Sequence, residues 1–379
     1  MDFELSEDQQ ALRAGAGALL DDLASPARVR AHAAGDEPFD RSLWAAMAEQ
    51  GWQAVDASEA DGGLGLGLVE MAVLCEALGA HVAPVPFLGS VLARGALAAA
   101  VAAGRAGGDA EVPGVGRRAD EAAAALAAGE TTGALAWSRR PDAVTARLGG
   151  GGWTLSGRGD PVVDGVGAAV LVVFAATAEG PGLFALAPPA GGGWRAEPAM
   201  DRTRTQGWLD LDDTPAMFLG DAQEADALWD RSATLAAAEM LGGARRAMEM
   251  AVEYAKDRVQ FGRPIGSFQA VKHRCADMLV DVEGMHSSGY YAAWAVGAGD
   301  PEAHAAASAA KVWCSDASAR VMAGALQVHG GIGFTWEHDL HFYVKRAQLD
   351  RLRVGDATVH RERLAAILRP RAEKGEPVL

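Results

Sequence analysis

The hydrophobic pattern changes its period twice along the chain, and this change limits the fold more than any other feature. Residues 1–105 place apolar side chains at helical spacing in an alanine-rich background. Residues 132–211 instead contain short runs of β-forming residues separated by Gly, Pro and Asp. From about residue 227 the helical spacing returns and continues almost to the last residue. The pattern predicts an α+β protein, mainly α, with helices first, a small β unit second and a helical bundle third.

Capping and turn residues predict several boundaries. Ser6 with Gln9 has the pattern of a capping box, and Asp40 is a suitable N-cap. Gly79 is expected to end a helix, and Gly149–Gly152 to form a hairpin tip. Helices are expected over residues 41–51, 69–78, 88–102, 235–259, 268–296, 300–329 and 356–368. Strands are expected over residues 132–138, 153–156, 168–175, 182–187 and 207–211. A linker is expected over residues 106–118, and domains over residues 1–118, 119–226 and 227–379.

The Gly242-Gly243 pair stands inside the predicted helix over 235–259. Each glycine costs about 1 kcal/mol relative to alanine in a helix interior, so the pair needs a compensating reason. Close packing of two helices is the favoured interpretation, and room for a bulky ligand is the alternative.

Charge and composition exclude some functions. The chain has 34 Lys+Arg and 50 Asp+Glu, a net charge of −16, which argues against general nucleic-acid binding. A locally basic pocket for an anionic ligand remains compatible with this balance. Three scattered cysteines do not form a disulfide framework or a zinc site, and no metal is expected. Without a signal-peptide pattern or an apolar stretch of about 20 residues, a cytoplasmic protein without a membrane span is expected.

The most unusual stretch runs from Tyr254 to His273 and reads YAKDRVQFGRPIGSFQAVKH. A predicted helix ends in it with Arg258-x-Gln-Phe-Gly, and a proline fixes the turn that follows. An arginine at a helix end beside exposed amides is a suitable phosphate ligand. Arg258 and Arg263 could instead cap the end of the helix.

A second unusual stretch runs from Gln327 to Glu337 and reads QVHGGIGFTWE. Adjacent glycines let a ligand approach the backbone closely, and Gln327 and His329 add an amide and an imidazole. The alternative is an ordinary turn at the end of a helix.

Together, in this order and about seventy residues apart, the two stretches resemble the acyl-CoA dehydrogenase family. The resemblance covers the whole chain, because the opening Asp2-Phe-x-Leu-Ser-Glu-Asp-Gln, the segment from Trp44 to Trp52 and the loop Gly62-Gly-Leu-Gly65 also match. It implies an N-terminal helical domain, a middle β-barrel or sandwich domain and a C-terminal four-helix bundle. It also implies FAD, an acyl-CoA substrate, electron-transfer flavoprotein as the electron acceptor, and a homotetramer or dimer.

The resemblance assigns cofactor-binding roles to residues of both stretches. Arg258, Gln260 and Phe261 match the Arg-x-x-Phe segment that binds the cofactor. The remaining matches are Ile265, Phe268 and Gln269 around the adenosine part, and Gln327, Gly330 and Gly331 at the pyrophosphate. A guanidinium group, amides and open backbone are suitable donors for a diphosphate.

The sequence departs from the family at the catalytic base. Most members carry a glutamate in a Tyr-Glu-Gly-Thr turn before the last helix, and counting without gaps from Arg346 places Gly355 there. Other members carry it twenty-six residues before the arginine that matches Arg258, where this chain has Ser232. Asp356, one residue after Gly355, is the first substitute, with an N-cap role as the alternative.

Glu239 is a weaker candidate for the base. It stands seven residues after Ser232, on the same face of the predicted helix, and an ion pair with an arginine is the alternative. The β region departs as well, since Pro161 replaces the tryptophan that stacks on the flavin in many members, and residues 137–142 lack the acidic, Gly/Ser-rich character of the family loop.

Three functions therefore stay open. The first is an FAD-dependent acyl-CoA dehydrogenase that oxidises a thioester to its 2,3-enoyl product and passes electrons to an electron-transfer flavoprotein. The second is a non-catalytic subunit of a heterotetrameric acyl-CoA dehydrogenase. The third is a flavin oxidase or monooxygenase that acts on a substrate without CoA.

Overall fold

The computed structural model describes residues 4–106, 110–189 and 193–377. These residues divide into two compact units, each built from several segments of the chain. Unit 1 contains Met1–Ala31, Leu68–Ala83 and Ala233–Leu379, and unit 2 contains His32–Gly67 and Pro84–Ser232. The three consecutive domains expected from the sequence stay a prediction. Residues 2 and 3 of the opening motif, and residues 107–109 of the expected linker, lie outside the described residues.

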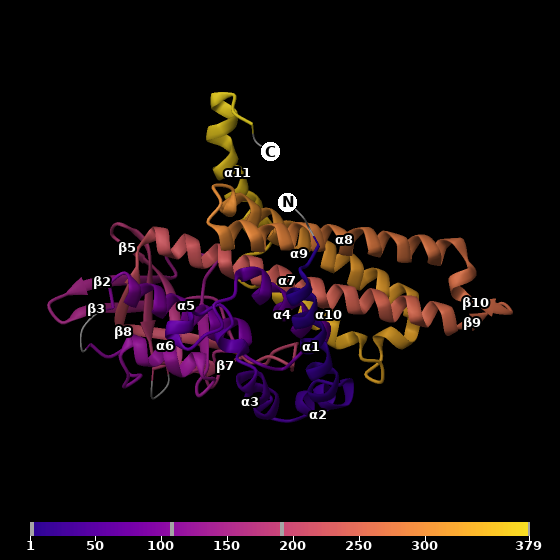
Figure 1. The fold of residues 1–379 in the computed structure, drawn as a ribbon, viewed down its shortest axis with the longest axis horizontal. Helices are drawn as coiled ribbons and strands as arrows, with labels where there is room; N and C mark the ends of the chain where they lie inside the picture. Colours follow the sequence, from indigo (N-terminus) through magenta and orange to yellow (C-terminus); the bar gives the residue numbers. More distant parts are fainter. Residues whose placement is uncertain (1–3, 107–109, 190–192, 378–379) are drawn as a thin grey trace. The chain divides into compact units, whose positions relative to one another are not determined.

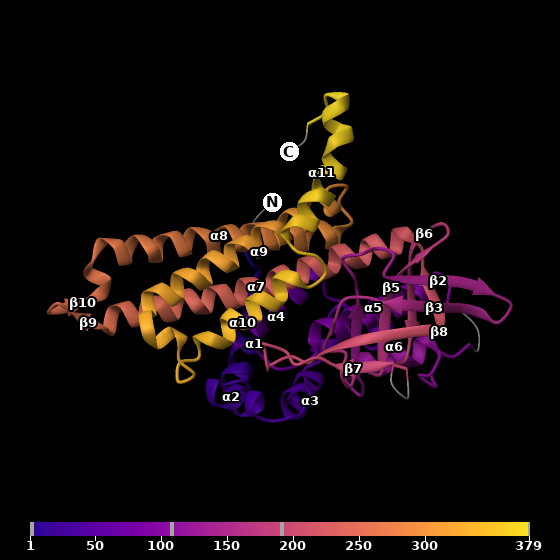
Figure 2. The same cartoon turned by 180° about the vertical axis from the view of Figure 1, so that it is seen from behind.

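Long helices dominate unit 1, and α7, α8 and α9 run alongside one another in both views (Figure 1, Figure 2). A short hairpin, β9–β10, joins α7 to α8 at one end of this bundle. The elements of unit 1 are α1 (Glu7–Leu23), most of α2 (Pro26–Ala34), α4 (Leu68–Ala80), the larger part of α7 (Ala222–Asp257), β9 (Val259–Gln260), β10 (Arg263–Pro264), the 3₁₀ turn η3 (Ile265–Ser267), α8 (Gln269–Ala298), α9 (Ala303–His329), η4 (Gly330–Phe334), α10 (Leu340–Leu352) and α11 (Ala357–Lys374).

Unit 2 contains a closed β-barrel. Strand β5 pairs with β2 and β6, β8 pairs with β3 and β6, and β2 pairs with β3, so these strands form a ring. The elements of unit 2 are α3 (Arg41–Glu49), the 3₁₀ turns η1 (Trp52–Ala54) and η2 (Glu59–Asp61), α5 (Phe87–Ala102), α6 (Ala119–Ala127), β1 (Gly133–Ala136), β2 (Val144–Gly149), β3 (Gly152–Arg158), β4 (Val162–Val163), β5 (Val170–Thr177), β6 (Gly180–Leu186), β7 (Trp194–Ala196) and β8 (Gln206–Gly220).

An aromatic cluster fills the barrel. Trp153 stacks on Phe218 with ring centroids 5.6 Å apart, and both rings meet Phe184 edge-on. Leu171 and Val173 of β5 are fully buried in the same core. Because side chains of alternating residues enter this core, the short β-rich runs of the sequence become strands.

The capping predictions are confirmed. Ser6 and Gln9 form both hydrogen bonds of a capping box, and the Asp40 carboxylate accepts bonds from the first backbone N–H groups of α3. Gly149 pairs with Gly152 at the end of the β2–β3 hairpin. Each of these features depends on residues close together in sequence, which is why the sequence predicts them.

The prediction that Gly79 ends its helix is wrong, because α4 continues to Ala80. A Cβ atom on Gly79 would overlap the backbone carbonyl oxygen of Glu239, and one on Gly242 would overlap that of Glu76. Both glycines therefore let α4 and α7 approach each other closely, and Gly242 faces α4 rather than space for a ligand. Helices α2, α6 and α10 were not predicted. The segment expected to be a linker also differs, because its Val112 is buried rather than exposed.

Candidate functional site

The two unusual stretches of the sequence meet at one end of the bundle in unit 1. The ring of Tyr254, in the last turn of α7, stacks on His329 at the end of α9, with centroids 4.8 Å apart. Gly324 of α9 lies against Met278 of α8, so the three helices converge here. Segments about seventy residues apart in sequence thus form one surface.

The β9–β10 hairpin places an exposed aromatic side chain at this end. Gln260 pairs with Arg263, and the two residues between them, Phe261 and Gly262, have φ of 52° and 77°. Asparagine or glycine normally occupies such positions, and a bulky side chain there is strained. Phe261 is nevertheless 92% exposed, although its ring meets that of Phe268 edge-on, with centroids 6.0 Å apart. The Arg263 guanidinium lies 4.2 Å from the ring centre of Phe268, which is half-buried.

The second stretch presents open backbone. Gly330 has φ 63° and ψ −140°, a conformation that essentially only glycine adopts. Gly331 has no positive φ, is exposed, and a Cβ atom on it would meet nothing within 4 Å. Neither its backbone conformation nor its packing therefore requires a glycine at this position. A glycine is expected at such a place where a ligand approaches the backbone closely.

His329 adds a buried hydrogen-bonding atom beside these glycines. Its Nδ1 lies 2.8 Å from the Ala325 carbonyl oxygen, which can only accept, so Nδ1 donates. Burial lowers the pKa of His329, so the neutral ring presents Nε2 as an acceptor. Nε2 is buried and has no hydrogen-bond partner among the described residues. A ligand hydroxyl or amino group would satisfy it.

The residues expected to bind the cofactor all lie on these segments of unit 1. Arg258, Gln260, Gln269 and Gln327 are exposed, as are Phe261 and Gly331, whereas Ile265, Phe268 and Gly330 are half-buried. The structure therefore places guanidinium, amide, aromatic and open-backbone groups on segments at this end of the bundle, and their binding of a dinucleotide stays a prediction.

A second group of candidate residues surrounds the turn between α10 and α11. This turn contains Val354, with φ 51°, and Gly355, with φ 101°. Asp356 follows, and its Oδ1 accepts hydrogen bonds of 2.9 and 3.0 Å from the backbone N–H groups of Thr358 and Val359. The predicted N-cap role of Asp356 is thus present, while its role as a base stays a prediction.

Gly355 is unsuited to carry a side chain in this backbone. Its φ is rare for residues with a Cβ atom, and a Cβ atom there would lie 3.0 Å from Val359 and 3.2 Å from His360. A glutamate at position 355 would therefore require the turn to change conformation.

Lys311 holds this turn in place through hydrogen bonds to backbone carbonyl oxygens. Its side chain is fully buried, and Nζ donates to the carbonyl oxygens of Gly355 at 2.8 Å and of Asp350 and Arg351 at 3.1 Å. His360 Nε2 donates to the Val354 carbonyl oxygen at 3.0 Å. Burial lowers the pKa of Lys311 to about 7 and that of His360 to about 3. The turn is therefore fixed through its backbone.

Glu239 is fully engaged by arginines. Its Oε1 lies 2.9 Å from Arg346 Nη1, and its Oε2 lies 3.8 Å from Arg353 Nη1. All three side chains are buried. The alternative of an ion pair is thus present, and proton transfer to Glu239 would first have to break it.

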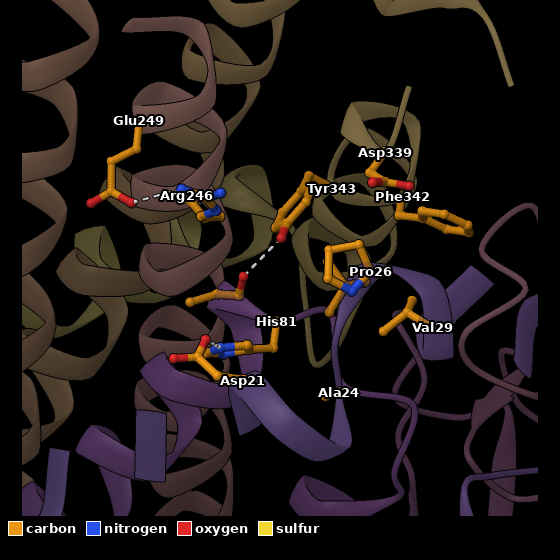
Figure 3. A pocket seen from close by; sticks show the side chains of 12 residues that line it. Asp21, Ala24, Pro26, Val29, His81, Arg246, Glu249, Asp339, Phe342 and Tyr343 are labelled. Atoms are coloured by element: carbon orange, nitrogen blue, oxygen red, sulfur yellow. Dashed lines mark hydrogen bonds and ion pairs between the residues drawn. The ribbon is translucent and has the colours of Figure 1, made fainter. Parts of the chain in front are cut away.

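A cavity of about 410 Å³ opens elsewhere in unit 1, lined by α1, α2, the end of α4, α7 and α10 (Figure 3). Its polar groups are paired: His81 with Asp21 at 3.0 Å, Arg246 with Glu249 at 3.6 Å, and the Tyr343 hydroxyl with the Ala80 carbonyl at 2.8 Å. The cavity lining includes none of the residues that the sequence singles out.

Sequence reasoning missed Lys311, His360, Arg346 and Arg353. The sequence contains a signal for Lys311, because it is the one charged residue in the alanine-rich segment 305–314. The other three stand in charged segments that read as solvent-facing, and only their tertiary contacts show their burial. Among the described residues, no group of three or more His, Cys, Asp or Glu is placed to hold a metal, and no helix is long and apolar enough to cross a membrane.

A helical bundle together with a closed β-barrel is the architecture expected for a flavoenzyme of the dehydrogenase type. The family descriptions "Acyl-CoA dehydrogenase, N-terminal domain" and "Acyl-CoA dehydrogenase, C-terminal domain" match residues 6–106 and 227–368. Acyl-CoA dehydrogenase IpdE2 of Mycobacterium tuberculosis is 36% identical over 342 residues, which cover 90% of this chain and 91% of that protein. The chain belongs to the acyl-CoA dehydrogenase family, whose members are FAD-dependent.

Two solved structures are similar over nearly the whole chain. One is a variant of the Tcur3481-Tcur3483 steroid acyl-CoA dehydrogenase, with a TM-score of 0.87 and 31% identity, covering 97% of this chain and 99% of that one. The other is the ChsE4-ChsE5 complex from Mycobacterium tuberculosis, with a TM-score of 0.85, 31% identity and the same coverage. Both confirm the expected fold of N-terminal helices, central β-barrel and C-terminal helical domain.

Proposed function

We propose that this chain is one subunit of a heteromeric, FAD-dependent acyl-CoA dehydrogenase. The assembly removes hydrogen across Cα and Cβ of an acyl-CoA thioester and passes the electrons to an electron-transfer flavoprotein. The observation that carries the proposal is the turn before α11, where Gly355 has φ 101°, Lys311 binds its carbonyl, and Asp356 caps the helix. In this role a related partner chain supplies the catalytic carboxylate.

The arrangement of carboxylates supports this division of labour. A base for this reaction must be a carboxylate within reach of the proton on Cα. Position 232 is a buried serine whose hydroxyl donates to the Leu228 carbonyl oxygen, and Glu239 is paired with Arg346. Asp356 is the remaining candidate from the sequence, and its carboxylate already stabilises the first turn of α11.

The bundle end of unit 1 fits FAD. Arg258, Gln260, Gln269 and Gln327 would donate to its oxygen atoms, Phe261 and Phe268 would contact its rings, and Gly330 and Gly331 would leave room for its phosphates. A flavin held there would supply the hydride-accepting chemistry of the dehydrogenation. His329 Nε2 would accept a hydrogen bond from a hydroxyl or amino group of the cofactor.

The similar proteins support a heteromeric assembly and a bulky substrate. The names of the two solved structures describe complexes of paired chains, and one is called a steroid acyl-CoA dehydrogenase. We extend both properties to this chain: a related chain as partner, and a polycyclic or similarly bulky acyl group as substrate class.

A second function is a self-sufficient homo-oligomeric dehydrogenase with Asp356 as base. What favours it is that the Asp356 carboxylate is only partly buried and stands one residue from the usual position of the glutamate. An asparagine at this position would keep the N-cap and remove the base, whereas alanine would remove both.

An anaerobic titration distinguishes the two functions. The purified chain, supplied with FAD, is mixed with a panel of acyl-CoA thioesters while the visible flavin spectrum is recorded. We expect no bleaching for the chain alone, and bleaching once it is co-purified with a related chain that carries the glutamate. Bleaching by the chain alone that disappears in Asp356→Asn would contradict the heteromeric proposal and establish the second function.

A further inference from the structure

A buried cluster of two arginines and one aspartate lies in unit 2, and one of the arginines stands next to position 232 in the sequence. Arg94 of α5 and Arg231 of α7 both form ion pairs with the carboxylate of Asp56. Each arginine engages a different carboxylate oxygen, Oδ1 for Arg94 and Oδ2 for Arg231. The three side chains come from three separate segments of the chain, so the cluster is a product of the tertiary structure.

Within the cluster, two guanidinium groups face one carboxylate. Asp230, which precedes Arg231 on α7, is buried as well. Asp61 contributes at a distance to the charge around Arg94, and it is exposed and bonded to the Ser58 hydroxyl. Asp56 thus shares one negative charge between two guanidinium groups.

The arginines also retain unused donors. The Nε atoms of Arg94 and Arg231 are buried and have no hydrogen-bond partner among the described residues. Burial lowers the pKa of Arg231 to about 10 and also lowers that of Arg94, as expected when a buried cation is incompletely compensated. Buried charges in proteins are normally paired, so this shortfall needs an explanation.

The geometry leaves one side of the cluster open. The Arg94 and Asp56 side chains are 6% and 7% exposed, whereas that of Arg231 is 26% exposed. An anion that arrives from outside would therefore contact Arg231 first, with Arg94 and Asp56 behind it. Arginine presents its donors in a planar fork that matches carboxylate and phosphate oxygens.

A rigid loop holds Asp56 in place. Backbone hydrogen bonds join Leu64 to Ala54, Gly65 to Ala57 and Leu66 to Val55, on both sides of Asp56. A Cβ atom on Gly63 would overlap the carbonyl oxygens of Ala54 and Ala57. The glycine-rich segment that the sequence shares with its family therefore folds tightly around Asp56 and fixes it before any ligand binds.

We infer that Arg231, Arg94 and Asp56 form an oxyanion-binding subsite that takes a carboxylate or phosphate group. The choice of ligand rests on the proposed function: an acyl-CoA whose acyl group ends in a carboxylate, or a phosphate of the thioester or cofactor. Arg231 contacts the anion, Arg94 supplies the second positive charge, and Asp56 keeps the two guanidinium groups oriented.

Binding of simple anions tests the subsite without turnover. The full-length, FAD-supplemented protein is titrated with glutarate, with inorganic phosphate and with chloride at matched ionic strength, by calorimetry and by the shift of the melting temperature. We expect glutarate or phosphate to bind and chloride to have no specific effect. Arg231→Gln should weaken this binding about ten- to hundredfold, the range expected for lost hydrogen bonds to a charged group.

Two further variants make the result specific. Arg231→Lys keeps the charge but loses the fork, so it should restore only part of the affinity. Arg195→Gln removes an arginine of β7 whose side chain is 57% exposed, and it should bind the anions like the unaltered protein. Stronger binding of glutarate assigns the subsite to a carboxylate, and stronger binding of phosphate assigns it to a phosphate group.

Equal binding by the unaltered protein and Arg231→Gln, or binding no stronger than that of chloride, overturns the inference. Neither result depends on whether the flavin can be reduced. Anion binding by a protein whose flavin stays unbleached even beside a related chain that carries the glutamate would leave the subsite standing while the dehydrogenase proposal fails.

Discussion

Replacing Lys311 with methionine should change how the stability of the protein depends on pH. The ammonium group is fully buried under the turn before α11, and its pKa in the folded chain is about 7. In the unfolded chain a lysine has a pKa of about 10.4. Between these two values the unfolded chain binds the proton and the folded chain does not, so folding becomes more favourable as the pH rises.

The size of this pH dependence follows from the difference between the pKa values of Lys311 in the folded and unfolded chains. A difference of about three units corresponds to about 4–5 kcal/mol over the whole window, or about 1.4 kcal/mol per pH unit inside it. Lys311→Met lacks this titration. It also leaves the carbonyls of Asp350, Arg351 and Gly355 without their donor, at a cost of about 1–3 kcal/mol for each group left unpaired. The variant is therefore less stable, and its disadvantage grows with pH.

Urea unfolding at two pH values measures this difference. Tryptophan fluorescence and circular dichroism are followed at about pH 7.5 and about pH 9, and the free energy of unfolding of Lys311→Met is subtracted from that of the unaltered chain. The difference should increase by about 2 kcal/mol between the two conditions. Lys374→Met, at the exposed end of α11, is the matched control and should give no such increase. A difference that stays constant with pH would mean that Lys311 remains charged in the folded chain, and the reasoning would fail.

Three further predictions concern the packing and the cofactor surface. Gly242→Ala should destabilise the chain by about 1–3 kcal/mol in thermal or urea unfolding, because its Cβ atom would overlap the Glu76 carbonyl, whereas Gly243→Ala, with 3.5 Å to its nearest neighbour, should change stability by less than about 1 kcal/mol. Tyr290→Phe should cost about 1–3 kcal/mol in the same assay, because the hydroxyl donates a 2.6 Å bond to the buried Glu76 carboxylate; no loss would show that solvent replaces this bond. Phe261→Asn should relieve the positive φ and stabilise the apoprotein by about 0.5–1 kcal/mol while it weakens FAD retention in gel filtration, and unchanged retention would exclude a cofactor contact for Phe261.

Local signals predicted much of the fold. The capping box of α1, the N-cap of α3 and the glycine tip of the β2–β3 hairpin each depend on a few adjacent residues, and the structure contains all of them. The end of α4 was predicted wrongly for an instructive reason. Gly79 reads as a helix stop from its own chain, but it is retained inside the helix because α7 passes too close for a side chain.

The candidate site was predictable only in part. The Arg-x-Gln-Phe-Gly and Gln-x-x-Gly-Gly stretches identify the bundle end by residue type, and the structure adds the contact between Tyr254 and His329. The state of each carboxylate was open in the sequence. From the sequence, Asp356 could be a base or a cap, and Glu239 a base or an ion-pair partner. The structure adds the cap and the ion pair, while the role of either carboxylate as base stays a prediction.

The sequence by itself determined the order of helical and β segments and the lack of a glutamate at positions 232 and 355, and it predicted which residues bind a dinucleotide. These properties are carried by residue type and short spacing. Only the tertiary structure decided the partners of the buried charges: Glu239 with Arg346, Lys311 with the turn at Gly355, and Asp56 with two arginines. A buried charge is stable only beside its counter-charge or donors, and those come from segments far away in the chain.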